Sequence, residues 1–203
     1  MKHSYLALGD SYTIGEQVSI DQSFPYQTVQ LLRKAKRSFY APEIIATTGW
    51  RTDELNLAID DTILLPAYDF VSLLIGVNNQ YQDKSAEEFR GHFRVLLEKA
   101  IQSVGGQANH VIVLSIPDWG VTPFAVNKPT EKIRSEIDVF NFICQAEAEH
   151  FQTHFLDITT SQRLNGNNGE FLAHDQLHSS GKEYFKWAQQ LSDIIQSVLN
   201  KSL

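Results

Sequence analysis

Five short apolar runs recur along the 203-residue sequence, and each ends at a glycine or at polar residues. Runs of this length and composition are typical of strands that are buried on both faces of a sheet. We therefore predict β-strands at residues 5–8, 43–47, 70–75, 110–115 and 154–158.

Segments with apolar residues at helical spacing lie between these runs and after the last one. Their starts carry residues that favour helix N-termini, including two Ser-x-x-Glu capping boxes. Helices are expected to begin at Ser23 (with Pro25 in the first turn), at Thr52 or Asp53, at the box Ser85–Glu88, at Thr130, and at the box Ser180–Glu183. Residues 117–129 and 165–169 are expected to be loops because they are rich in proline, glycine and asparagine.

Strands that alternate with helices at this spacing predict a mostly parallel sheet with helices on both faces. The fold class is therefore α/β, with five strands in the sheet. The sequence shows no internal repeat, low-complexity tract or linker, so we expect residues 1–203 to form one domain.

Composition and charge narrow the range of partners. The formal net charge is −7, which disfavours nucleic acid and anionic membranes because both attract basic surfaces. No apolar run approaches the roughly 20 residues of a membrane span, and the N-terminal apolar run is too short for a signal peptide. We expect a cytoplasmic protein with a small-molecule partner, as a monomer or a homodimer. Cys144 is the only cysteine, so no internal disulfide can form.

Polar residues follow the predicted strands at the points where each strand ends. In parallel sheets these carboxyl ends share one edge, which is where ligands bind. The residues concerned are Gly9-Asp10-Ser11, Thr48-Gly49-Trp50, Gly76-Val77-Asn78-Asn79, and the segment His174-Asp175-Gln176-Leu177-His178 before the last helix.

These residue types suit acyl transfer. A serine hydroxyl such as that of Ser11 is a weak nucleophile and needs a base, which His178 can supply. Asp175 lies three residues before His178 and can orient its ring. The oxyanion of a tetrahedral intermediate needs fixed donors, for which the candidates are the N–H groups of Ser11 and Gly49 and the amide of Asn78.

Other interpretations of the same residues are possible. Ser11 can be a helix cap, and Asp10 can bond to the backbone of its turn. A metal site formed by His174, Asp175 and His178 would need further ligands, and only Asp10 is at hand. Arg51 can bind an anionic group of a substrate or take part in a salt bridge. Residues 10–15 can also form a phosphate-binding loop of flavin type, but such a loop makes no use of Asp175 and His178.

Four aromatic residues near the strand ends are candidates for substrate binding, because ligand pockets are rich in aromatic side chains. They can line an acyl or alcohol pocket, or they can fill the core at the ends of elements. They are Trp50, Tyr81, Trp119 and Phe124.

The order Ser, Gly, Asn and Asp-x-x-His resembles the four blocks of the SGNH hydrolases, also called the GDSL esterase/lipase superfamily. The resemblance extends over nearly the whole chain. Tyr12 replaces the usual leucine of the first block, and Asn79 replaces the usual aspartate of the third. The resemblance implies a three-layer α/β/α fold of flavodoxin type, catalysis without metal or cofactor, and hydrolysis of esters or, less often, thioesters.

We therefore expect a serine esterase that acts through Ser11, His178 and Asp175 on small or short-chain acyl esters, such as acetylated sugars or short lipids. A lysophospholipase, a thioesterase and an acyltransferase would use the same residues. A ligand-binding module without catalytic activity is the alternative from another class.

Overall fold

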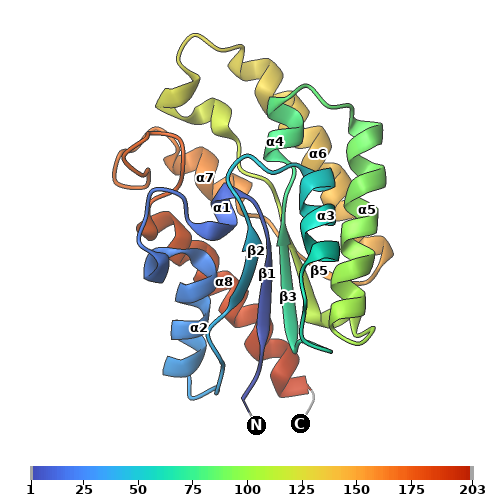
Figure 1. Ribbon diagram of the computed structural model, residues 1–203. Helices are drawn as coiled ribbons and strands as arrows, with labels where there is room; N and C mark the ends of the chain where they lie inside the picture. Colours follow the sequence, from blue (N-terminus) through green and yellow to red (C-terminus); the bar gives the residue numbers. More distant parts are fainter. Residues whose placement is uncertain (1, 202–203) are drawn as a thin grey trace.

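The computed structural model describes residues 2–201 and contains a five-stranded sheet in the order β2-β1-β3-β4-β5 (Figure 1). Each neighbouring pair of strands in this sheet is parallel. The order is that of flavodoxin-like sheets, in which the chain reverses direction across the sheet beside β1. The strands are β1 Tyr5–Gly9, β2 Glu43–Ala46, β3 Phe70–Leu74, β4 Val111–Leu114 and β5 His154–Leu156.

Helices cover both faces of the sheet. Helices α2 and α8 pack together on one face, and α3, α5 and α6 lie on the other (Figure 1). This confirms the predicted three-layer α/β/α architecture. The helices are α1 Ser11–Ile14, α2 Phe24–Lys34, α3 Thr52–Asp61, α4 Val77–Tyr81, α5 Ala86–Ser103, α6 Thr130–His150, α7 Thr159–Asn165 and α8 Gly181–Lys201. Short 3₁₀ turns are η1 Ile20–Gln22, η2 Ala108–His110, η3 Trp119–Val121 and η4 Pro123–Ala125. Within residues 2–201, no helix has both the length and the apolar character needed to cross a membrane.

Burial explains why the apolar runs become strands. Every residue of β1, β3 and β4 is buried, as expected for central strands covered on both faces. The edge strands β2 and β5 are only partly buried. Gly9 extends the first strand by one residue beyond its predicted end, and a Cβ at this position would collide with Thr13 and with the carbonyl of Leu74. Because Gly9 has no side chain, the short helix that carries Thr13 can pack directly against β1 and β3.

Several predicted helix starts are wrong in detail. Arg51, not Thr52 or Asp53, occupies the N-cap of α3, and the Glu54 carboxylate accepts a hydrogen bond from its N–H. Pro129 precedes the first residue of α6, so Thr130 does not cap that helix. Ser23, by contrast, occupies the N-cap of α2 with Pro25 in the first turn, as predicted, although its hydroxyl donates to the carbonyl of Ile20 and makes no capping hydrogen bond.

The capping box at the start of α8 is also wrong, whereas the cap of α5 is present. The Ser180 hydroxyl donates to the Glu170 carbonyl, and the Glu183 carboxylate accepts from Ser161 and Trp187. In α5, by contrast, the Ser85 hydroxyl accepts from the N–H of Glu88. Tertiary partners therefore displace a local motif where they are available.

Candidate active site

The predicted site residues come from four connections at the carboxyl end of the sheet, the upper edge in Figure 1. Ser11 begins α1 directly after β1, and Gly49 lies in the turn between β2 and α3. Asn78 belongs to α4 after β3, and His178 lies in the loop before α8. A parallel sheet brings these ends together, so residues far apart in the sequence meet at one place.

A continuous chain of hydrogen bonds links Asp175, His178 and Ser11. Nε2 of His178 lies 2.9 Å from Oγ of Ser11, and Nδ1 lies 2.5 Å from Oδ2 of Asp175. Ser11 is 4% exposed and His178 is 7% exposed, so water has little access to these contacts. This geometry is compatible with the roles expected from the sequence, in which Ser11 is a nucleophile, His178 a base and Asp175 the carboxylate that orients the base. Because both ring nitrogens of His178 are engaged, the geometry does not support the metal interpretation.

Asp175 is held so that it stays ionised. Burial acts to raise its pKa, but hydrogen bonds from the His178 ring and from the backbone N–H groups of Leu177 and His178 outweigh burial. The pKa of Asp175 therefore lies below its usual value. Both backbone bonds are 3.0 Å long and end on Oδ1, which leaves Oδ2 for the imidazole.

Tyr12 supports the other side of the histidine. Its ring lies 4.9 Å from the ring of His178, at a tilt of 50°, and also contacts the buried indole of Trp187. Tyr12 therefore forms part of the packing around His178. This contact could not be recognised in the sequence because it joins the first turn to the last loop.

Asp10 bonds to the backbone of its own turn, which was the simpler interpretation of this residue. It is fully buried, and Oδ1 accepts a hydrogen bond from the N–H of Tyr12 at 3.0 Å. Burial raises the pKa of Asp10 to about 7, although the hydrogen bond from Tyr12 opposes the rise. The Tyr12 N–H, which a phosphate-binding loop would offer to its ligand, is therefore already bonded to the Asp10 carboxyl group.

Replacing Asp10 with asparagine is expected to remove a pH-dependent loss of stability. The pKa is raised in the folded state, so between about pH 4 and pH 7 the folded protein binds a proton that the unfolded chain has lost. The free energy of unfolding of the wild type therefore falls as pH rises through this window. At about 1.4 kcal/mol for each tenfold difference in acid strength, the fall is a few kcal/mol.

Urea unfolding at pH 4 and pH 8 measures this effect. Asp10→Asn keeps an acceptor for the Tyr12 N–H, so the variant should gain stability relative to the wild type as pH rises. Comparing the two proteins cancels the titration of all other groups. An Asp10→Asn effect of equal size at both pH values would contradict the buried, protonated state.

The structure shows the surroundings of two of the proposed oxyanion donors, Asn78 and Gly49. The Asn78 amide donates one hydrogen to the Trp50 carbonyl at 3.0 Å, and its second hydrogen remains available to the cavity that Asn78 lines. Gly49 lines the same cavity and has φ of +85°, a conformation that favours glycine. A Cβ at Gly49 would meet no atom within 4 Å, so the backbone angle and not space calls for glycine there.

Asn79 bonds to Thr52, the first residue of α3. Its Oδ1 accepts from the N–H of Thr52 at 3.1 Å, and its Nδ2 donates to the Thr52 hydroxyl at 2.8 Å. Asn79 thus holds the start of α3 against α4.

A cavity of about 200 Å³ opens beside Ser11 and His178. Three of the four aromatic candidates line it. They are Tyr81, Trp119 and Phe124. The ring centroid of Trp119 lies 5.1 Å from that of Tyr81 and 6.2 Å from that of Phe124. Trp50 does not line the cavity and instead packs partly against the core. The cavity is also lined by four residues to which the sequence assigned no role, Tyr12, Thr48, Val77 and Leu177, and each of them belongs to a segment or block that was named.

The remaining candidates lie outside this cavity. The guanidinium of Arg51 pairs with Asp53 at 2.9 Å and donates to Gln82 at 2.8 Å, which fits the salt-bridge interpretation. His174 is exposed and lines a different hollow together with Pro123 and Gln176.

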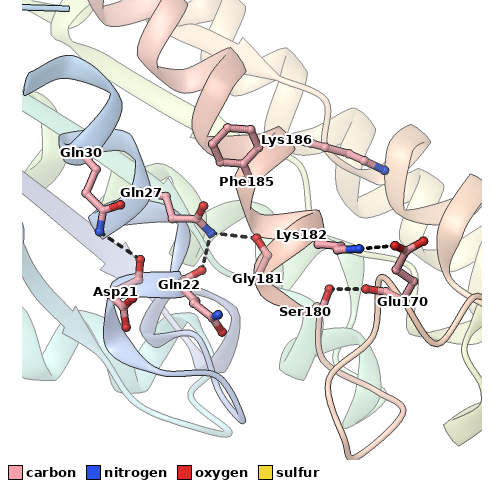
Figure 2. Close-up of a pocket in the computed structure, with 10 residues that line it drawn as sticks. All are labelled: Asp21, Gln22, Gln27, Gln30, Glu170, Ser180, Gly181, Lys182, Phe185 and Lys186. Carbon is pink, nitrogen blue, oxygen red and sulfur yellow. Dashed lines mark hydrogen bonds and ion pairs between the residues drawn. The ribbon is translucent and has the colours of Figure 1, made fainter. Parts of the chain in front are cut away.

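A wider hollow of about 670 Å³ lies between η1, α2 and the start of α8 (Figure 2). Its polar side chains are largely engaged with one another or with backbone. Gln27 donates to the carbonyls of Gln22 and Gly181, and Lys182 pairs with Glu170. Of the site residues expected from the sequence, none lines this hollow.

Comparisons with known proteins agree with this geometry. The model of the GDSL-like lipase/acylhydrolase family matches residues 7–184. A comparison with curated protein sequences finds no match.

Solved structures of similar fold include three esterases or lipases. An acetylxylan esterase from Geobacillus stearothermophilus has a TM-score of 0.75 at 16% identity, covering 95% of this chain and 94% of that one. A lipase/acylhydrolase from Enterococcus faecalis has a TM-score of 0.73 at 16% identity, covering 99% and 97%. A psychrotrophic esterase from Pseudoalteromonas sp. has a TM-score of 0.70 at 12% identity, covering 98% and 100%. Because the family model spans most of the sequence, the chain belongs to the GDSL-like lipase/acylhydrolase family and is a hydrolase that acts on ester bonds.

Proposed function

We propose that the protein is a serine esterase that removes small acyl groups through an acyl-enzyme. The observation that carries the proposal is the hydrogen-bonded chain from Asp175 through His178 to Ser11, which ends at a partly apolar cavity. A nucleophile with an oriented base at the wall of a cavity is what acyl transfer requires.

In the proposed mechanism, Oγ of Ser11 attacks the ester carbonyl while Nε2 of His178 takes its proton. The Asp175 carboxylate stabilises the imidazolium that forms. The backbone N–H groups of Ser11 and Gly49 and the free amide hydrogen of Asn78 bind the oxyanion. His178 then gives its proton to the leaving alcohol, and water repeats the sequence on the acyl-enzyme with His178 again as base.

The size of the cavity supports small acyl groups. Its volume of about 200 Å³ is below the roughly 300–1,000 Å³ of pockets that enclose drug-sized ligands. The acetylxylan esterase of similar fold is named for removing acetyl groups, which agrees with the same preference. The esters we favour are acetyl and other short-chain esters of sugars or small alcohols.

Hydrolysis of p-nitrophenyl esters from acetate to decanoate tests the proposal. We expect kcat/KM to be highest for acetate or butyrate and to fall at least about tenfold toward decanoate, since each extra methylene that does not fit costs binding. The absence of hydrolysis across the series would refute the esterase assignment. A maximum at decanoate would refute the small acyl preference alone.

A further inference from the structure

Gln80 lies outside the predicted catalytic machinery but contacts it through Trp119. It is 5% exposed and sits on α4, two residues after Asn78. Its Oε1 accepts a hydrogen bond of 2.7 Å from Nε1 of Trp119, and its Nε2 donates one of 2.8 Å to Oε2 of Glu136 on α6. The side chain therefore joins the cavity wall to α6, which packs against both α4 and η3.

The two hydrogen bonds of Gln80 form a relay from Trp119 to Glu136, and the chemistry of these two end residues fixes its direction. The indole of Trp119 can only donate, and an ionised carboxylate such as Glu136 can only accept. A residue between them must accept on one side and donate on the other, which an amide does and neither a carboxylate nor an apolar side chain can. The identity of Gln80 is thus specified by both neighbours.

Gln80 fixes the ring of Trp119, while other residues fix the backbone beneath it. Asp118, directly before the tryptophan, accepts hydrogen bonds from the Gly120 N–H at 3.0 Å and from Arg163 Nε at 2.8 Å. Its own N–H donates to Gln162. These bonds anchor η3 without Gln80, so loss of Gln80 would free the indole and leave the loop in place.

The orientation of Trp119 determines the shape of the cavity. The indole is 6% exposed and stands between Tyr81 and Phe124, both of which meet it edge-on. Both neighbours are substantially exposed, so neither ring is itself fixed by close burial. Among these three cavity-lining rings, Trp119 is the one held by a buried hydrogen bond, and its rotation would enlarge or reshape the cavity beside Ser11.

We propose that Gln80 is a positioning residue for substrate selectivity. Through its bonds to Trp119 and Glu136 it holds the wall that limits the size of the substrate group admitted to the cavity. This inference rests on the proposed esterase function, whose test on the wild type comes first.

A charge swap between positions 80 and 136 gives a sharp test. At a pH at which both carboxylates are ionised, Gln80→Glu can still accept from Trp119 but has no donor for Glu136, so the bond to α6 is replaced by repulsion and the acceptor of the Trp119 indole is no longer anchored. Glu136→Gln keeps an acceptor for Gln80 and serves as the matched control. In the double variant, glutamate at position 80 accepts from Trp119 and also from glutamine at position 136, so both hydrogen bonds re-form and only the one between positions 80 and 136 is reversed.

Two substrate series report the effect, one of p-nitrophenyl esters with growing acyl chains and one of acetate esters with growing alcohols. In at least one series, Gln80→Glu should raise kcat/KM for the larger substrates relative to the smallest by about tenfold. Glu136→Gln should change this ratio less than about twofold, and the double variant should restore it.

Selectivity unchanged in both series for Gln80→Glu, or unrestored in the double variant, would overturn the proposal. Should Gln80→Glu fail to fold, Gln80→Met removes both hydrogen bonds at similar volume and should shift selectivity in the same direction; an unchanged ratio there is equally decisive against it. A wild type that hydrolyses no ester refutes the proposed function itself, whereas an active wild type with indifferent variants refutes only the role of Gln80.

Discussion

Ser11→Ala is expected to lower kcat for p-nitrophenyl acetate by roughly 10⁴- to 10⁶-fold without unfolding the protein. The hydroxyl that His178 contacts at 2.9 Å is the only group in the proposed mechanism that bonds covalently to the acyl group. Its removal leaves the cavity and the oxyanion donors in place, so weak residual hydrolysis is expected. Steady-state kinetics on both proteins, with thermal unfolding to check the fold, measures the change.

Asn78→Ala is the matched comparison for the serine variant. It removes one oxyanion donor, which is expected to lower kcat by about 10²–10³ with a smaller effect on KM, because the oxyanion forms only in the transition state. Retention of wild-type activity by Ser11→Ala would refute the assigned nucleophile. An Asn78→Ala effect confined to KM would instead remove the amide from the oxyanion site.

The strands and layers were predictable because burial leaves a direct mark on sequence. The run predicted as a strand, residues 70–75, is apolar apart from Ser72 and stops before Gly76, as a strand covered on both faces requires, and residues 70–74 of it form β3. Helix ends were less predictable. Glu183 matches a capping box by spacing, yet it bonds to Ser161 and Trp187, and a local pattern cannot register partners that only the fold supplies.

Candidate site residues were predictable where the rule of strand ends applied. Ser11 and His178 are 167 residues apart, but each lies at the edge of the sheet where polar residues follow strands. Supporting contacts were not predictable in this way. The bond between Gln80 and Trp119 and the packing of Tyr12 on His178 depend on how side chains point within the folded molecule. Trp50 shows the same limit, since its place beside Gly49 said nothing about where its ring lies.

Asp175→Asn is expected to lower kcat by about 10⁴-fold while leaving the fold intact. Asparagine can keep the two backbone hydrogen bonds that end on Oδ1, so the loop before α8 should hold its shape. The amide that replaces Oδ2 would donate to Nδ1 of His178 and not accept from it. The imidazole would then carry its proton on Nε2, the atom that faces Ser11 and must accept the serine proton. The loss would thus come from the wrong tautomer and not from misplacement. Ester hydrolysis within tenfold of the wild type, in a variant with unchanged thermal stability, would mean that Asp175 does not govern the base.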